Sequence, residues 1–139
     1  MAALRQRGAL IAVLLGFFIV MLDATIVNVA LADIGTDLDA PVASLQWVVD
    51  SYTLVFAAFL LTSGAACDRL GARAVYMFGL LLFGALSVVC ALAPTGGALV
   101  AARAAQGAGA SAVVTGSLAL LAVIYTEPDA RSRAIGLWG

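Results

Sequence analysis

Four long apolar stretches constrain this chain more than any other feature of its sequence. They cover residues 8–32, 45–66, 74–93 and 98–125. Their only charged residues are Asp23, Asp50 and Arg103. Each stretch contains at least about 20 residues, the length that an α-helix needs to cross a bilayer core about 30 Å thick, and a helix bonds its backbone polar groups internally, as lipid requires. The sequence therefore predicts an all-α membrane protein with four transmembrane helices.

The composition favours lipid as the solvent for this chain. Of its 139 residues, 64% are hydrophobic and 11% are charged, whereas about a quarter of the residues in soluble domains are charged. A soluble fold this short could not bury so much apolar surface. All seven basic residues are arginine, so no imidazole is available for metal binding or acid–base catalysis. The sequence also lacks the basic patch that nucleic-acid binding requires, and no nucleic-acid partner is expected.

The charges between the apolar stretches predict the orientation of the chain. The arginines outside the stretches are Arg5, Arg7, Arg69, Arg73, Arg131 and Arg133. The first connection instead carries Asp33, Asp37 and Asp39, and the third connection, residues 94–97, is neutral. Arginine-rich segments stay in the cytoplasm by the positive-inside rule. We therefore expect a multi-pass protein of the cytoplasmic membrane with its N-terminus in the cytoplasm.

The aromatic residues and the cysteines fit this orientation. Trp47 and Tyr52 lie near the outer start of the second helix and Tyr125 at the inner end of the fourth, where we expect interfacial anchors. Cys67 and Cys90 fall near opposite faces of the membrane, about 30 Å apart for a spanning helix. No disulfide is expected between them, because a disulfide requires far shorter separations.

The two ends of the chain raise separate questions. Two arginines followed by an apolar run and Ala30-Leu31-Ala32 resemble a signal peptide with its cleavage site. The run is long for such a segment, and Asp23 interrupts it. Residues 134–139 turn apolar again and are interpreted as the start of a fifth helix. The chain is therefore interpreted as the N-terminal part of a longer protein.

The strongest motif lies between the second and third stretches and reads G-x-x-x-D-R-x-G-x-R. Gly64 would let another helix approach closely, and Gly71 would allow a tight turn. Asp68 would pair with Arg69 or Arg73, or lie at a helix N-terminus, where its charge is favoured. An ordinary charged loop that obeys the positive-inside rule is the alternative. We expect this segment to be a cytoplasmic loop.

The fourth stretch opens with the pattern R-x-x-Q-G-x-G-A. Arg103, Gln106, Gly107 and Ala110 share one helical face, and Gly109 completes the pattern. An arginine within a membrane is costly and marks function with an acidic partner by default. The alternative is an arginine that reaches the nearby membrane surface with its long side chain.

The first stretch contains L-D-x-T-I-V-N-V-A-L around Asp23. Arg103 is expected to lie about 6 Å shallower in the membrane than Asp23, by the helical rise per residue. A long arginine side chain can cover much of that gap, which makes the two residues candidate partners, and Asp23 is also a candidate proton-carrying acid. A structural buried ion pair without a role in transport is the alternative. Thr25 and Asn28 lie on another face of the helix and are expected to form hydrogen bonds between helices.

Asp50 is the remaining charge within the apolar stretches. It lies about 1.5 turns inside the second stretch, by the helical rise per residue. Hydration at the membrane interface explains this position as well as substrate contact does. Both interpretations stay open.

Together these motifs resemble the major facilitator superfamily, and the pattern around Asp23 resembles its fourteen-helix drug:proton antiporter branch. That pattern ends in proline where this chain has Ala32. The resemblance implies two six-helix bundles, with this chain supplying four helices of the N-terminal bundle. It also implies that the loop around Asp68 latches the cytoplasmic side and that Arg103 takes part in proton coupling.

We therefore expect that the full-length protein exports small amphipathic compounds in exchange for protons. The proton gradient would supply the energy, with no cofactor, and the missing C-terminal remainder would be a partner. Asp23 would bind and release the proton, and Arg103 would tune this step. The segment from Gly64 to Arg73 would act as the gate on the cytoplasmic side. The alternatives are a self-contained four-helix oligomeric exporter and a non-transporting membrane anchor or assembly subunit. An enzyme is not expected, because no nucleophile–base set is present.

Overall fold

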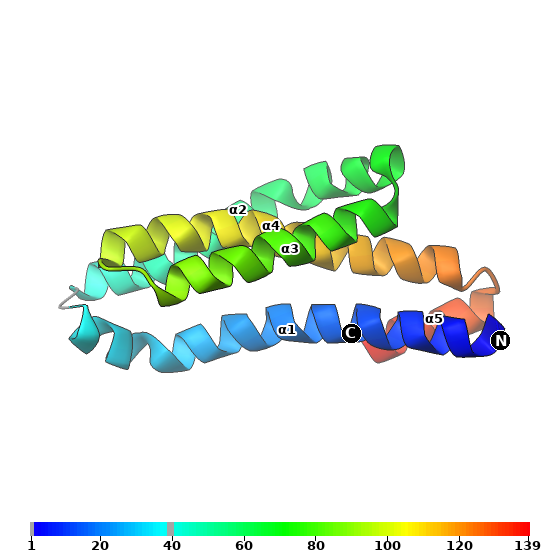
Figure 1. The fold of residues 1–139 in the computed structure, drawn as a ribbon, viewed down its shortest axis with the longest axis horizontal. Helices are drawn as coiled ribbons and strands as arrows, with labels where there is room; N and C mark the ends of the chain where they lie inside the picture. Colours follow the sequence, from blue (N-terminus) through cyan, green and yellow to red (C-terminus); the bar gives the residue numbers. More distant parts are fainter. Residues whose placement is uncertain (1, 39–40) are drawn as a thin grey trace.

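The computed structural model describes residues 2–38 and 41–139, and these residues form an all-helical protein. The helices are α1 (Ala2–Asp37), α2 (Val42–Leu70), α3 (Ala72–Ala91), α4 (Gly96–Ile124) and α5 (Pro128–Trp138). The first four are long and apolar enough to cross a membrane. Consecutive long helices run in opposite directions, and α5 turns back beside the N-terminal half of α1 (Figure 1). The prediction of four spanning helices is confirmed.

Several helix bounds differ from those expected. Helix α1 continues past residue 32 to Asp37, so Asp33 lies within a helix and not in a connection. Ala32, unlike proline, does not interrupt the helical hydrogen bonds. Asp39 lies outside the described residues. Helix α5 begins at Pro128, earlier than residue 134, because proline is favoured in the first turn of a helix and Asp129 suits its N-terminal dipole.

Helix α4 is the centre of the bundle. Half of its most apolar segment is buried inside the protein, compared with 17% for α1. Its contacts with α2 and α3 depend on small residues: a Cβ atom at Gly107 would collide with the backbone of Tyr52, and one at Gly109 would lie 3.0 Å from the backbone nitrogen of Phe83. Such close approach is typical of helices that associate within lipid.

The core lies where α1, α2, α3 and α4 meet. Its buried members are Val20, Tyr52, Tyr76, Phe83, Ala110 and Val113. Helix α1 is attached there by the Tyr76 hydroxyl, which donates a 2.8 Å hydrogen bond to the backbone oxygen of Ala12. Helix α5 is fixed by Trp138, which lies 4.3 Å from the ring of Phe17 and donates to the hydroxyl of Ser117.

The G-x-x-x-D-R-x-G-x-R segment is not a loop. Helix α2 continues through Leu70, α3 begins at Ala72, and Gly71 alone separates them. Gly71 adopts a φ of 89°, a conformation that favours glycine, so the tight turn expected at this position is present. The remaining motif residues extend the two helices because none of them prevents helix formation.

Candidate functional site

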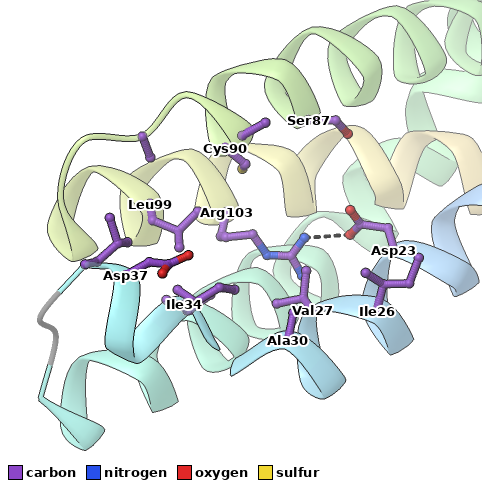
Figure 2. Close-up of a pocket in the computed structure, with 14 residues that line it drawn as sticks. Asp23, Ile26, Val27, Ala30, Ile34, Asp37, Ser87, Cys90, Leu99 and Arg103 are labelled. Carbon is purple, nitrogen blue, oxygen red and sulfur yellow. Dashed lines mark hydrogen bonds and ion pairs between the residues drawn. The ribbon is translucent and has the colours of Figure 1, made fainter. Parts of the chain in front are cut away.

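A polar cluster connects α1, α3 and α4 inside the apolar bundle. Arg103 donates from one terminal nitrogen to Asp23, at 2.5 Å, and to the side-chain oxygen of Gln106, at 2.7 Å. The Gln106 amide nitrogen donates to the other oxygen of Asp23, at 3.2 Å, and to the hydroxyl of Ser87, at 2.8 Å. Figure 2 shows Arg103 extending along the bundle toward Asp23. Gln106 therefore holds both members of the ion pair.

The cluster is enclosed. Arg103 is 2% exposed and Gln106 is fully buried. The alternative in which Arg103 reaches the membrane surface is wrong. Gly107 and Ala110 are buried as well, so the four residues expected to share a helical face do share one. Among the described residues, Arg103 and Asp23 form the only ion pair.

Tyr52 takes a different place from the one expected. It is 7% exposed, and the Arg103 guanidinium lies 4.2 Å from the centre of its ring. A cation over an aromatic face is attracted by the ring quadrupole. The expectation that Tyr52 anchors the helix at the interface is wrong, and its ring supports the guanidinium instead. Trp47, five residues earlier, is 56% exposed and free to lie at the interface.

A pocket of about 370 Å³ borders the ion pair. It extends along α1 and is also lined by residues from the end of α3 and from the start of α4 (Figure 2). Its polar lining residues are Asp23, Asp37, Ser87, Cys90 and Arg103. The remainder of the wall is apolar and includes Val27, Ile34 and Leu99. The ion pair therefore borders an open space whose wall is mostly apolar.

Sequence reasoning missed Ser87 and Cys90. Both lie on α3, whose stretch contains no charge and offered no candidate. The Cys90 thiol donates to the Gln106 side-chain oxygen at 3.5 Å. The available signal was their spacing of three residues, which places two polar side chains on one helical face. Cys67 and Cys90 are both free thiols, in agreement with the expectation that they form no disulfide.

Asp50 does not belong to the site. It lines a separate shallow pocket between α1 and α2, together with Asn28. Thr25 and Asn28 donate to the backbone oxygens of Met21 and Ala24 on their own helix. The expectation that they form hydrogen bonds between helices is wrong, because the helix backbone offers nearer acceptors four residues earlier.

The charged residues of the α2–α3 turn are exposed. Asp68 lies in the last turn of α2, not at a helix N-terminus, and in the described part of the chain it forms no ion pair with Arg69 or Arg73. A Cβ atom at Gly64 would meet Thr115 at 3.8 Å, an ordinary contact, so Gly64 is not required for close approach here. These side chains lie far along the bundle from the Asp23–Arg103 pair.

Four membrane-length helices that enclose a charged pair are typical of a multi-pass membrane protein with a functional polar site. The chain belongs to the Major Facilitator Superfamily, whose profile matches residues 13–139. The family expected from the three motifs is confirmed.

Relatives of this chain are named as resistance and export proteins. It is 46% identical over 123 residues to the methylenomycin A resistance protein of Streptomyces coelicolor, covering 88% of this chain and 26% of that protein. It is 46% identical over 133 residues to the multidrug resistance protein Stp of Mycobacterium tuberculosis, covering 96% and 25%. It is 40% identical over 127 residues to the cephamycin export protein CmcT of Amycolatopsis lactamdurans, covering 91% and 26%. The chain thus spans about a quarter of the length of these relatives.

Proposed function

We propose that the full-length protein containing this chain exports small amphipathic compounds in exchange for protons. It lies in the cytoplasmic membrane with its N-terminus in the cytoplasm, so that the Asp37 end of the bundle faces outward. The arginine-rich connections support this orientation. The names of its relatives, which refer to resistance and export, support the direction of transport.

The observation that carries the proposal is the enclosed Asp23–Arg103 pair. Its carboxylate joins α1 to α4 through Arg103 and Gln106. Adding a proton to Asp23 removes its negative charge and one hydrogen-bond acceptor site, which weakens both connections. Arg103 forms the ion pair with the Asp23 carboxylate, and the ring of Tyr52 supports Arg103 from α2. Proton binding at the Asp23 carboxyl group would thereby weaken the attachment of α1 to α4.

The α2–α3 turn is the proposed gate. Asp68, Arg69 and Arg73 are exposed at the cytoplasmic end, and Gly71 fixes the angle between the two helices that carry them. Exposed charges of both signs are suited to transient ion pairs with the second bundle. Asp68→Asn should slow transport while leaving membrane insertion intact. An unchanged rate of transport in this variant would refute the gating role.

The test of proton coupling is Asp23→Asn in the full-length transporter. We expect proton-driven efflux to fall by about a hundredfold or more, since the substituted amide keeps the size of the side chain but cannot carry the proton. Asp33→Asn is the matched control, because Asp33 is an exposed carboxylate on the same helix outside the pocket. Efflux at the wild-type rate in Asp23→Asn would refute the assignment.

A further inference from the structure

A second cavity lies between α2 and α3, near the turn that joins them. It is an apolar groove of about 440 Å³. Helix α4 contributes only the small residues Ala108 and Ala112 to its lining. The lining from α2 and α3 includes the exposed apolar side chains of Phe59, Leu70 and Phe78. The groove shares no lining residue with the pocket beside the ion pair, so it is a separate feature of the bundle.

The groove is about as long as one leaflet of a membrane. On α2 it extends from Phe59 to Leu70, which is about 16 Å at the rise of an α-helix. Half of a bilayer core about 30 Å thick is about 15 Å. The α2–α3 turn lies toward the same end of the bundle as the N-terminus, and the two membrane-length helices meet there (Figure 1). A further spanning helix would require a contact surface across the whole core, whereas the acyl chain of a lipid requires one leaflet.

The interior of the groove suits hydrocarbon better than water. Ser63 is the buried polar residue of its lining, and the Ser63 hydroxyl forms a 3.0 Å hydrogen bond with that of Ser111. In the described part of the chain, neither hydroxyl is among the buried polar atoms that lack a partner. Thr62, the other polar residue of the lining, is exposed. An apolar cavity whose polar groups are already satisfied stays dry and accepts apolar ligands.

The end of the groove at the turn is positively charged. Arg69 lines an adjoining hollow that shares three residues with the groove. Arg73 is exposed and directly precedes Ala74, which lines the groove on α3. Neither arginine forms an ion pair within residues 2–38 and 41–139, and the exposed Asp68 offsets one of the two positive charges. The guanidinium groups are therefore available to an anion, and their planar arrangement of donors suits a phosphate group.

We propose that this groove binds one acyl chain of an anionic phospholipid whose phosphate group is held by Arg69 and Arg73. The lipid belongs to the leaflet that the α2–α3 turn faces. The inference goes beyond transport and requires only that the turn lies at a membrane surface. The apolar length of the groove favours a lipid over a soluble anion, and the two arginines favour an anionic lipid over a zwitterionic one.

The experiment measures lipid binding to the full-length protein in detergent by native mass spectrometry. Phosphatidylglycerol and phosphatidylcholine with identical acyl chains are titrated separately. We expect the first phosphatidylglycerol to bind about tenfold more tightly, because each arginine near an anionic surface contributes about fivefold and Asp68 offsets part of this gain. Equal affinity for the two lipids would overturn the proposal.

A matched pair of charge variants assigns the preference to this site. Arg69→Gln combined with Arg73→Gln should remove the preference for phosphatidylglycerol. Arg133→Gln should keep it, because Arg133 is an exposed arginine of α5 that does not line the groove. A preference that survives the double substitution would place the anionic lipid elsewhere and overturn the proposal.

Ala74→Phe tests the groove itself. Ala74 is exposed in the first turn of α3 and lines the groove, so the larger side chain occupies space there while the helix still forms. We expect the affinity for phosphatidylglycerol to fall about tenfold, because lost contact with two methylene groups already has this effect. Ala85→Phe is the control, since Ala85 is exposed on the same helix outside the groove, and should bind as the unaltered protein does. An equal effect of the two substitutions would overturn the proposal.

The same titrations distinguish the other possible occupants of the groove. Displacement of the lipid by glycerol phosphate would indicate a site for soluble anions and overturn the proposal. A dimer of the unaltered protein that becomes a monomer in Ala74→Phe would show that a second copy covers the groove, which would also overturn it. Circular dichroism of each variant records its helical content. Ala74→Leu, with a smaller side chain, replaces Ala74→Phe if that content falls.

Discussion

Helices α4 and α1 are held in the bundle by different interactions. Half of the most apolar segment of α4 is buried, and its glycines allow the backbones of α2 and α3 to contact the α4 backbone directly. Only 17% of the corresponding segment of α1 is buried. Individual polar bonds hold α1 instead, chiefly those of Asp23 with Arg103 and Gln106 and that of Tyr76 with Ala12.

The difference separates a rigid part of the molecule from an adjustable one. Close backbone packing allows little sliding, because every side chain on both helices would have to move together. A few polar bonds can instead be broken by a single proton. We infer that α2, α3 and α4 form a fixed unit and that α1 responds to protonation of Asp23. Four substitutions test this comparison.

Gly107→Ala should have the largest effect. The added methyl group would collide with the backbone of Tyr52 and lie 3.1 Å from the Phe56 nitrogen, neither of which can rotate away. We expect a loss of about 3 kcal/mol in the free energy of unfolding, measured by reversible denaturation in mixed micelles. Gly84→Ala is the control, since no atom lies near its added methyl group, and should gain up to about 1 kcal/mol in helix propensity. Equal effects at the two positions would contradict close packing of α4.

Gln106→Leu should have the second-largest effect on stability. It removes the hydrogen bond from α4 to Asp23 on α1 without altering the backbone contacts of α4. Leucine is of similar size but leaves one oxygen of Asp23 and the Ser87 hydroxyl without their donor. We expect a loss of about 2 kcal/mol in the free energy of unfolding. We also expect greater mobility of α1 than of α3, measured by spin labels on the exposed surface of each helix. Equal mobility of the two helices would contradict the division into fixed and adjustable parts.

Part of this architecture could be predicted from the sequence. The four spans follow from apolar length, and the pairing of Asp23 with Arg103 follows from their opposite charge and from a depth difference that a long arginine side chain can cover. The role of Ser87 was missed although its spacing from Cys90 was an available signal, and the role of Tyr52 could not be predicted. A helix surrounded by lipid is apolar on all sides, so its sequence does not reveal which face meets its neighbours. The extent of α1 was also missed, because its last turns are polar and resemble a connection.

Tyr76→Phe should have a smaller effect than Gln106→Leu. It removes the hydroxyl that bonds to the backbone oxygen of Ala12 and leaves the ring in the core. One lost hydrogen bond should reduce the free energy of unfolding by about 1 kcal/mol. The remaining bonds at Asp23 should keep α1 in place, so proton-driven efflux should stay within about twofold of the wild-type rate. Efflux that falls as far as in Asp23→Asn would show that Asp23 is not the principal attachment of α1.

Tyr52→Phe should have the smallest effect and is the counterpart of Tyr76→Phe. The Tyr52 hydroxyl is buried and has no hydrogen-bond partner among the described residues, so its removal breaks no bond and relieves a desolvated polar group. The phenylalanine ring still faces Arg103 at the same position. We expect the free energy of unfolding to change by less than about 0.5 kcal/mol. Tyr52→Leu, which removes the aromatic face, should reduce the free energy of unfolding by about 1 kcal/mol. It should also reduce efflux more than Tyr52→Phe does. If Tyr52→Phe is as damaging as Tyr52→Leu, the hydroxyl rather than the ring supports Arg103, and α2 takes part in the polar network instead of only supporting it.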